Sequence, residues 1–148
     1  MTHVAAESGC PVIIMHNRFD GANESIDILD DMDRWFETSL ELAKQSGISD
    51  ANITLDPGIG FGKTFKQNLI VLANLKRLKM LGYPILMGLS RKRFIGAILD
   101  AEADQRLFGT LSANLSSIMD GVDIIRVHDV KPHREAIDIW MAIDAERR

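Results

Sequence analysis

Four short apolar runs, each followed by a longer segment with helical spacing, constrain the fold of this 148-residue chain most strongly. The runs cover residues 11–16, 51–56, 84–89 and 122–127. Short apolar runs with few polar interruptions are typical of strands that are buried on both faces. Strands that alternate with helices predict an α/β fold with a parallel sheet, and both a doubly wound sheet and a barrel fit this pattern.

The segments between these runs predict helices with one apolar face each. We expect helices over residues 28–44 and 65–78, over 94–119 with a break near 101–104, and after Pro132. Residues 1–9 resemble the end of a preceding helix. We expect the scattered methionines to fill the core. The predicted buried positions are Ile28, Met32, Trp35, Phe36, Leu40, Ala43, Phe65, Leu69, Leu72, Leu75, Leu78, Ile137, Trp140, Met141 and Ile143.

Composition excludes several classes of protein. A net charge of −4 argues against general affinity for nucleic acid. No apolar run has the length of a membrane span, and no signal peptide is recognisable. Cys10 is the only cysteine, so an intrachain disulfide is impossible and a reducing cytoplasm is expected. No cluster of residues has the spacing of a metal site. We therefore expect one cytoplasmic domain without a membrane span and without general affinity for nucleic acid.

Polar side chains that could bind or react with a ligand follow all four predicted strands. They are His16, Asp56, residues 90–93, Arg126 and His128. In parallel α/β proteins the carboxyl ends of the strands form the edge at which ligands bind. We therefore expect the site at this edge.

The loop over residues 56–63, with the sequence DPGIGFGK, is the most informative motif. Its alternating glycines allow unusual backbone angles and close approach of a ligand. The spacing fits neither a Walker A loop nor a dinucleotide fingerprint. Asp56 is well placed to accept two N–H bonds from a guanidine-like heterocycle. The alternative is a tight turn in which Asp56 bonds only to local backbone.

For the other two polar loops, a purely structural role is also an alternative to ligand binding. The cations of residues 90–93 could form a solvated basic turn. Arg126 and His128 are two residues apart, so on a strand they would face the same side and could bind an anion. His128 could instead order the last loop, and Asp129 should cap the final helix or orient His128. We interpret His16 as structural.

Four motifs, taken together, resemble the dihydropteroate synthase family. They are LDPGIGFGKT, GLSRKRFIG, FGTLSAN and IIRVHDV, in this order, and PVIIMHNR near the start matches as well. The resemblance covers essentially the whole chain. It implies a TIM barrel that works as a homodimer. It also implies condensation of 6-hydroxymethyl-7,8-dihydropterin pyrophosphate with p-aminobenzoate, assisted by Mg²⁺. Enzymes of this family are targets of sulfonamides.

The resemblance also implies roles for residues. Asp56 would bind the amino and ring N–H groups of the pterin, and Lys92 would donate to its oxygen and ring nitrogen. Arg126 and His128 would hold the pyrophosphate, so these four residues are the catalytic set. The further substrate-binding positions are Met15, Phe61, Gly88, Ser90 and Arg93.

The chain departs from the family in two respects. Arg93 stands where many members have serine, near p-aminobenzoate. The 148 residues supply only four strand–helix units, whereas a barrel has eight. We expect one partial domain, residues 1–148, that corresponds to the C-terminal four units, lacks the metal-binding residue of the first strand and is inactive alone. The alternatives are a pterin-binding methyltransferase domain and a non-catalytic half-barrel.

Overall fold

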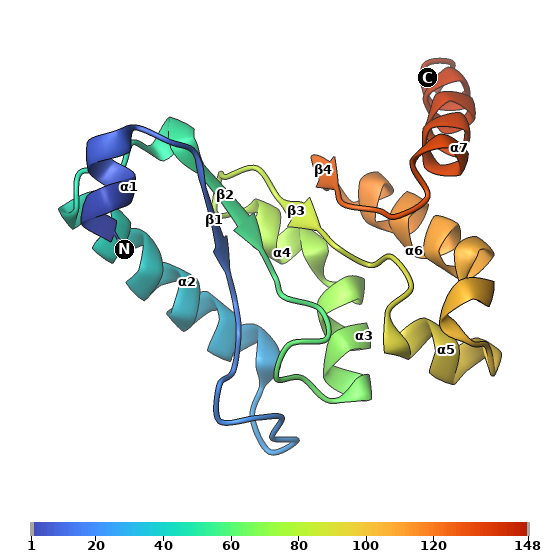
Figure 1. Cartoon of the computed structure of the whole chain (residues 1–148), viewed down its shortest axis with the longest axis horizontal. Helices are drawn as coiled ribbons and strands as arrows, with labels where there is room; N and C mark the ends of the chain where they lie inside the picture. The colour runs from blue at the N-terminus through green and yellow to red at the C-terminus, as the bar shows by residue number, and fades with distance from the viewer. Residues whose placement is uncertain (1, 148) are drawn as a thin grey trace.

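The four predicted strand–helix units are present in a computed structural model of the chain, which describes residues 2–147 (Figure 1). The first helix, α1, confirms the expected end of a helix before the first strand; Met1 lies outside the described residues. The elements in chain order are α1 (Thr2–Ser8), β1 (Val12–Met15), α2 (Ile28–Gln45), η1 (Asp50–Asn52), β2 (Ile53–Asp56), α3 (Phe65–Ala73), α4 (Leu75–Lys79), β3 (Leu86–Met87), α5 (Arg93–Leu99), η2 (Ala103–Gln105), α6 (Leu107–Met119), β4 (Ile124–Ile125) and α7 (Val130–Asp144).

The strands pair in parallel and in chain order. β1 pairs with β2 from Val12↔Ile53 to Met15↔Asp56, and β3 pairs with β4. A single parallel bridge between Leu55 and Ile85 joins the two pairs. Right-handed crossovers that always advance in one direction leave every helix on the same face of the sheet. This is the arrangement of a barrel segment, because a doubly wound sheet reverses its strand order.

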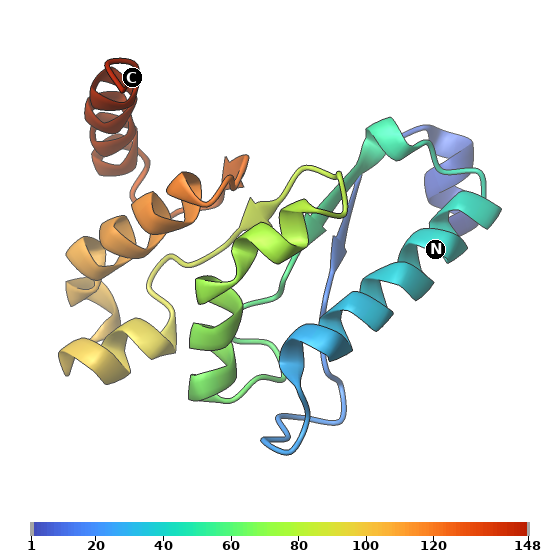
Figure 2. The same ribbon diagram turned by 180° about the vertical axis from the view of Figure 1, so that it is seen from behind.

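The helices cover one face of the strands and leave the other open. Helices α2 and α4 lie behind β1 and β2 in Figure 1 and in front of them in Figure 2. Ile53 and Leu55 are buried against the helices, whereas Ile13, which pairs with Thr54, is 58% exposed. Because side chains alternate along a strand, Asp56 points to the open face with Thr54. The last residue of β2 is therefore available to a ligand on that face.

Helix α2 supplies four buried apolar residues, which are Ile28, Met32, Phe36 and Ala43. Its predicted inward residues are in the core or packed on it, and Phe36 is fully buried. The helix begins at a capped position, where the Asp27 carboxylate accepts hydrogen bonds from the backbone N–H groups of Leu29 and Asp30. The predicted bounds of this helix were correct to within a residue.

Several strand and helix bounds differ from the prediction. The third and fourth strands shorten to two residues each. Just before this pairing begins, the Asp123 carboxylate accepts the Ile85 N–H at 2.8 Å, in the place of a backbone carbonyl. The helix predicted over 65–78 divides into α3 and α4 at Asn74, which leaves helical geometry at φ −127°. The break near 101–104 was predicted correctly.

Some positions predicted to be buried are exposed. Phe65 is 47% exposed because it lies in the first turn of α3, beside the polar loop. Met141 and Ile143 are 52% and 59% exposed, since α7 packs mainly on α6 and stands away from the other helices in Figure 1. Met80, at 83% exposure, contradicts the expectation for the methionines. Within residues 2–147, no helix combines the length and apolarity needed to cross a membrane.

His16, at the end of β1, is fully buried between the strands and α2. Its Nε2 lies 3.3 Å from the Asp31 carboxylate, and its ring meets Trp35 edge to face at 5.5 Å between centroids. Burial lowers the pKa of His16 to about 4, and the charge of Lys63 acts in the same direction, while Asp31 opposes it. The imidazole is therefore neutral at neutral pH.

This buried neutral histidine predicts a stability loss in acid. The unfolded chain binds a proton at about pH 6.5, so the contribution of His16 is complete above that pH and is lost as the pH falls toward 4. The difference of about 2.5 pKa units corresponds to roughly 3 kcal/mol. Denaturant unfolding of the wild type and of His16→Gln, compared between about pH 7 and pH 4, should give a steeper loss for the wild type. Parallel curves would contradict the assignment.

Candidate active site

Asp56, the last residue of β2, is a buried carboxylate at the carboxyl edge. Its Oδ1 accepts the backbone N–H of Gly58 at 2.7 Å. The hydrogen bond to local backbone, expected if Asp56 only stabilises a tight turn, is therefore present. Residues 2–147 make no hydrogen bond to Oδ2. Burial raises the pKa of Asp56, while the Gly58 N–H and the charges of Lys92 and Arg126 act against it. One carboxylate oxygen thus remains for a ligand.

Lys92 brings a cation to the same region from the start of α5. Its Nζ donates to the carbonyl of Ile59 at 2.7 Å and lies 4.3 Å from the centroid of the Phe61 ring. Burial lowers the pKa of Lys92, the charge of Asp56 raises it, and Arg126 lowers it. The ammonium is therefore held between the loop after β2 and the ends of β3 and β4.

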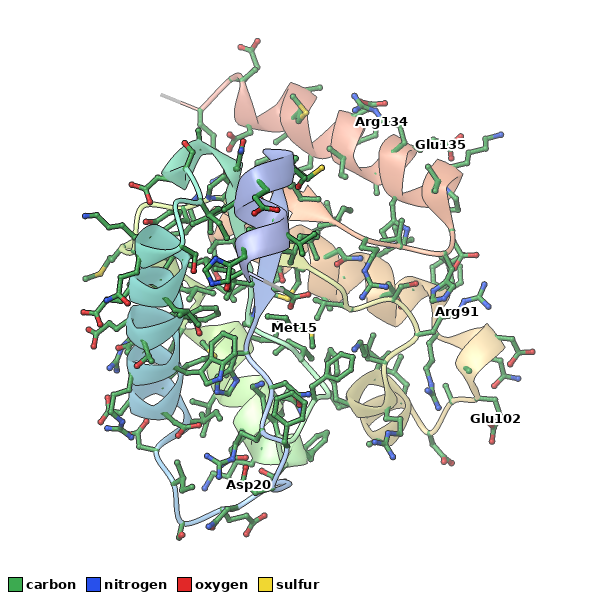
Figure 3. All side chains as sticks on the ribbon, turned by 60° about the vertical axis from the view of Figure 1, so that its left-hand side comes forward. Met15, Asp20, Arg91, Glu102, Arg134 and Glu135 are labelled. Carbon is green, nitrogen blue, oxygen red and sulfur yellow. The ribbon has the colours of Figure 1, made fainter. Side chains whose placement is uncertain are left out.

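Arg126 and Met15 complete the ring of side chains from the four strands. A methyl group added at Gly88 would lie 2.9 Å from Arg126 Nη2, so the guanidinium rests directly on the backbone after β3. A methyl group at Gly58 would lie 3.3 Å from Cγ of Met15. Met15 lies near the centre of the molecule in Figure 3. Each strand therefore contributes at least one predicted site residue to the same edge.

His128 lies at this edge but has a different partner from Arg126. Its Nδ1 is 2.9 Å from the Ser90 hydroxyl, which also accepts the His128 backbone N–H at 3.2 Å. β4 ends at Ile125, yet Arg126 and His128 are both exposed on either side of a half-buried residue, as strand alternation predicts. With Nδ1 engaged, Nε2 of His128 is the ring atom left for a ligand.

Asp129 does not act as predicted. It occupies the N-cap position of α7, but its side chain makes no capping bond. Its carboxylate instead binds Arg91, with Nη2 at 2.9 Å and 3.2 Å and Nε at 3.3 Å. Arg91 adopts φ +58°, which costs a non-glycine residue energy and is tolerated where surrounding contacts enforce it. This pair joins the loop after β3 to the loop after β4.

A cationic pocket of about 520 Å³ lies between the loop after β2 and the start of α5. Arg93 lies at its side and is exposed. Asp56 and Arg126 are not part of the lining, so the pocket is adjacent to their cluster. An anionic ligand with an apolar body suits this mixture of charge and ring surface. The lining residues are Gly60, Lys63, Phe65, Asn68, Ser90, Arg91, Lys92, Arg93, Phe94 and Ala97.

Residues 2–147 do not fit a magnesium site by themselves. They bring together no group of three or more His, Cys, Asp or Glu side chains that could hold a metal ion. The charges that act on Asp56 are those of Lys92, Arg126 and Lys63, which oppose binding of a second cation there.

Comparison with known proteins gives the family. The pterin-binding enzyme family matches residues 1–128. Dihydropteroate synthase from Clostridium beijerinckii is 45% identical over 139 residues, which are 92% of this chain and 50% of that protein. The chain thus spans about half the length of the curated relatives it matches.

Solved structures give the same result. Dihydropteroate synthase from Clostridium difficile, crystallised in the presence of pteroic acid, superimposes with a TM-score of 0.92 at 46% identity, over 97% of this chain and 54% of that one. The Xanthomonas albilineans enzyme with 4-aminobenzoic acid gives a TM-score of 0.95 at 35% identity, over 99% and 54%. The sequence and the strand-end geometry agree with these findings, and the chain belongs to the pterin-binding enzyme family, with dihydropteroate synthases among its relatives.

Proposed function

We propose that this chain carries the pterin and pyrophosphate sites of a dihydropteroate synthase. The reaction joins 6-hydroxymethyl-7,8-dihydropterin pyrophosphate to p-aminobenzoate and releases pyrophosphate. The observation that carries the proposal is the buried Asp56 carboxylate beside the cations of Lys92 and Arg126. The relatives named dihydropteroate synthase support it, as do the neighbours solved with pteroic acid and 4-aminobenzoic acid.

The pterin would bind on the open face of the strands. Its 2-amino group and ring N–H are donors, and Asp56 has one oxygen free of protein hydrogen bonds within residues 2–147. Lys92 would turn from the Ile59 carbonyl toward the acceptor atoms of the heterocycle. Met15 and Gly88 would contribute the apolar floor. A buried, charge-assisted pairing of this kind gives both affinity and orientation.

The pyrophosphate would bind Arg126 and His128, with Ser90 holding the imidazole in place. In the reaction, the bond between the pterin methylene and the pyrophosphate oxygen breaks with its electron pair on oxygen. The amine nitrogen of p-aminobenzoate forms the new bond and then loses a proton to solvent. Positive charge that develops on the pterin would be stabilised by Asp56, and the departing anion by Arg126.

The p-aminobenzoate would lie toward the cationic pocket, between Phe61 and Arg93. Phe61 is 38% exposed and presents ring surface beside Lys92. Arg93 lines the pocket at the start of α5 and could donate hydrogen bonds to the carboxylate. The family resemblance implies Mg²⁺ as well, but residues 2–147 do not form a site for it by themselves.

A homodimer is also part of the proposal. Exposed apolar side chains of α5 and α6, including Ile98, Leu99 and Phe108, surround a hollow of about 550 Å³ on the helical layer. Apolar surface of this kind favours association. Light scattering of the purified chain measures the mass directly.

Calorimetric titration tests the proposed function. The chain should bind 6-hydroxymethyl-7,8-dihydropterin pyrophosphate more tightly than an N5-methyltetrahydropterin without pyrophosphate, since only the first engages Arg126 and His128. Preference for the methylated pterin would favour the methyltransferase alternative. Binding of neither ligand would leave the non-catalytic half-barrel.

Lys92→Ala separates the two halves of the ligand. We expect it to weaken binding of 6-hydroxymethyl-7,8-dihydropterin by about tenfold or more, the effect of losing a charge-assisted hydrogen bond. Binding of pyrophosphate alone should change by less than about threefold, because Arg126 and His128 remain. Lys66→Ala, on the exposed side of α3, serves as the charge-matched control. Equal losses for both ligands would show that Lys92 acts only through its charge.

A further inference from the structure

Lys63 is a buried cation that sequence analysis did not single out. It ends the glycine-rich loop after β2 and is only 8% exposed. Its Nζ donates to three backbone carbonyls, those of His16 at 3.3 Å, Gly58 at 3.0 Å and Phe61 at 3.3 Å. An ammonium has three donors, so each proton has one acceptor. Such a match is specific to the charged form.

The three carbonyls belong to two different strand-end segments. Gly58 and Phe61 are in the loop after β2, whereas His16 follows β1. The segments are in direct contact, since a methyl group at Gly58 would lie 1.9 Å from the His16 oxygen. Lys63 therefore fastens the loop to the neighbouring strand end.

The fastened loop carries the groups that face the ligand. Gly58, whose carbonyl Lys63 binds, donates its N–H to Asp56 at 2.7 Å. The Phe61 N–H bonds back to the Gly58 carbonyl at 3.0 Å, and the Phe61 ring meets Lys92. A change at Lys63 is thus transmitted to Asp56 and to Phe61 through one or two hydrogen bonds.

We propose that Lys63 is a positioning residue for the pterin site, whose ammonium holds the loop of residues 57–63 against the end of β1 and thereby sets the geometry of Asp56 and Phe61. This inference rests on the proposed function for the identity of the ligand. The fastening itself is a property of the free chain. The two parts can therefore be tested separately.

The charge state of Lys63 is expected to control this fastening. Burial lowers the pKa of Lys63 to about 8. The charged groups that act on it are Asp56 at the end of β2, Asp31 on α2, Arg18 after β1 and Lys92 at the start of α5; the carboxylates raise the pKa and the cations lower it. A neutral amine keeps only two donors for three carbonyls. The loop should therefore loosen as the pH rises through about 8.

Two measurements on the chain test the proposal. In the ligand-free chain, the backbone amide NMR shifts of Gly58 and Phe61 should titrate together with a midpoint near pH 8. In Lys63→Met this titration should disappear, and the dissociation constant for 6-hydroxymethyl-7,8-dihydropterin should rise at least about tenfold. Lys66→Met removes the same charge from an exposed site three residues away and should change neither result.

The outcomes distinguish this proposal from the proposed function. Absence of pterin binding by the wild type would overturn the function, while the ligand-free titration would still decide the role of Lys63. Gly58 and Phe61 shifts that stay constant between about pH 7 and pH 9.5 would overturn the positioning role. So would a Lys63→Met variant that binds pterin as well as Lys66→Met. If Lys63→Met does not fold, the titration of the wild type alone supports or overturns the positioning role.

Discussion

Asp56→Asn is expected to raise the dissociation constant for 6-hydroxymethyl-7,8-dihydropterin by at least about 30-fold, which corresponds to roughly 2 kcal/mol. The asparagine can keep its oxygen on the Gly58 N–H, so the local turn survives. Its amide then presents donors to the donors of the pterin. The counter-charge to Lys92 and Arg126 is lost as well. Calorimetry or fluorescence titration measures the change.

Two comparisons make this result specific. Asp100→Asn removes one carboxylate from the exposed end of α5, where asparagine also tolerates φ +49°, and should bind pterin normally. The pKa of Asp56 is raised by burial, so wild-type affinity should decline as acid protonates it, whereas Asp56→Asn should lack that decline. An Asp56→Asn variant that binds within about twofold of the wild type would remove Asp56 from the site.

The fold could be predicted from sequence because it follows from local patterns. Apolar runs and helical spacing located the four units, and polar residues after each run located the edge. Strand lengths could not be predicted, since the beginning of the β3–β4 pairing involves the side chain of Asp123, which is 38 residues away from its partner Ile85. The exposure of α7 could not be predicted either, because it depends on which other elements pack against this helix.

The residues of the candidate site also fall into two groups, those that sequence could indicate and those that it could not. Asp56, Lys92 and Arg126 could be proposed from sequence because each follows a strand and belongs to a recognisable motif. Lys63 and the Arg91–Asp129 pair were missed, because their partners are set by tertiary folding. In sequence, a lysine after a glycine-rich loop indicates a solvent-facing charge. Only the three carbonyls that converge on it reveal a buried one.

Gly58→Ala is expected to lower the free energy of unfolding by about 2 to 5 kcal/mol. Gly58 has φ +64°, a conformation that costs an alanine about 1–2 kcal/mol. The added methyl would also lie 1.9 Å from the His16 oxygen and 3.1 Å from its carbonyl carbon. Both atoms are backbone, so the loop or the end of β1 must move, at a further cost of about 1–3 kcal/mol. That movement also breaks the carbonyl cage around Lys63.

Gly82→Ala separates the clash from the backbone strain. Gly82 has φ +82°, but a methyl there would meet nothing within 4 Å. It should therefore cost only the conformational part, about 1–2 kcal/mol, and leave pterin binding intact. Denaturant unfolding followed by circular dichroism gives both values. Because domains are stable by only about 5–15 kcal/mol, the loss in Gly58→Ala would be a large share of the total stability. Equal losses for the two variants would mean that the loop moves away from β1 freely, and would count against the fastening by Lys63 as well.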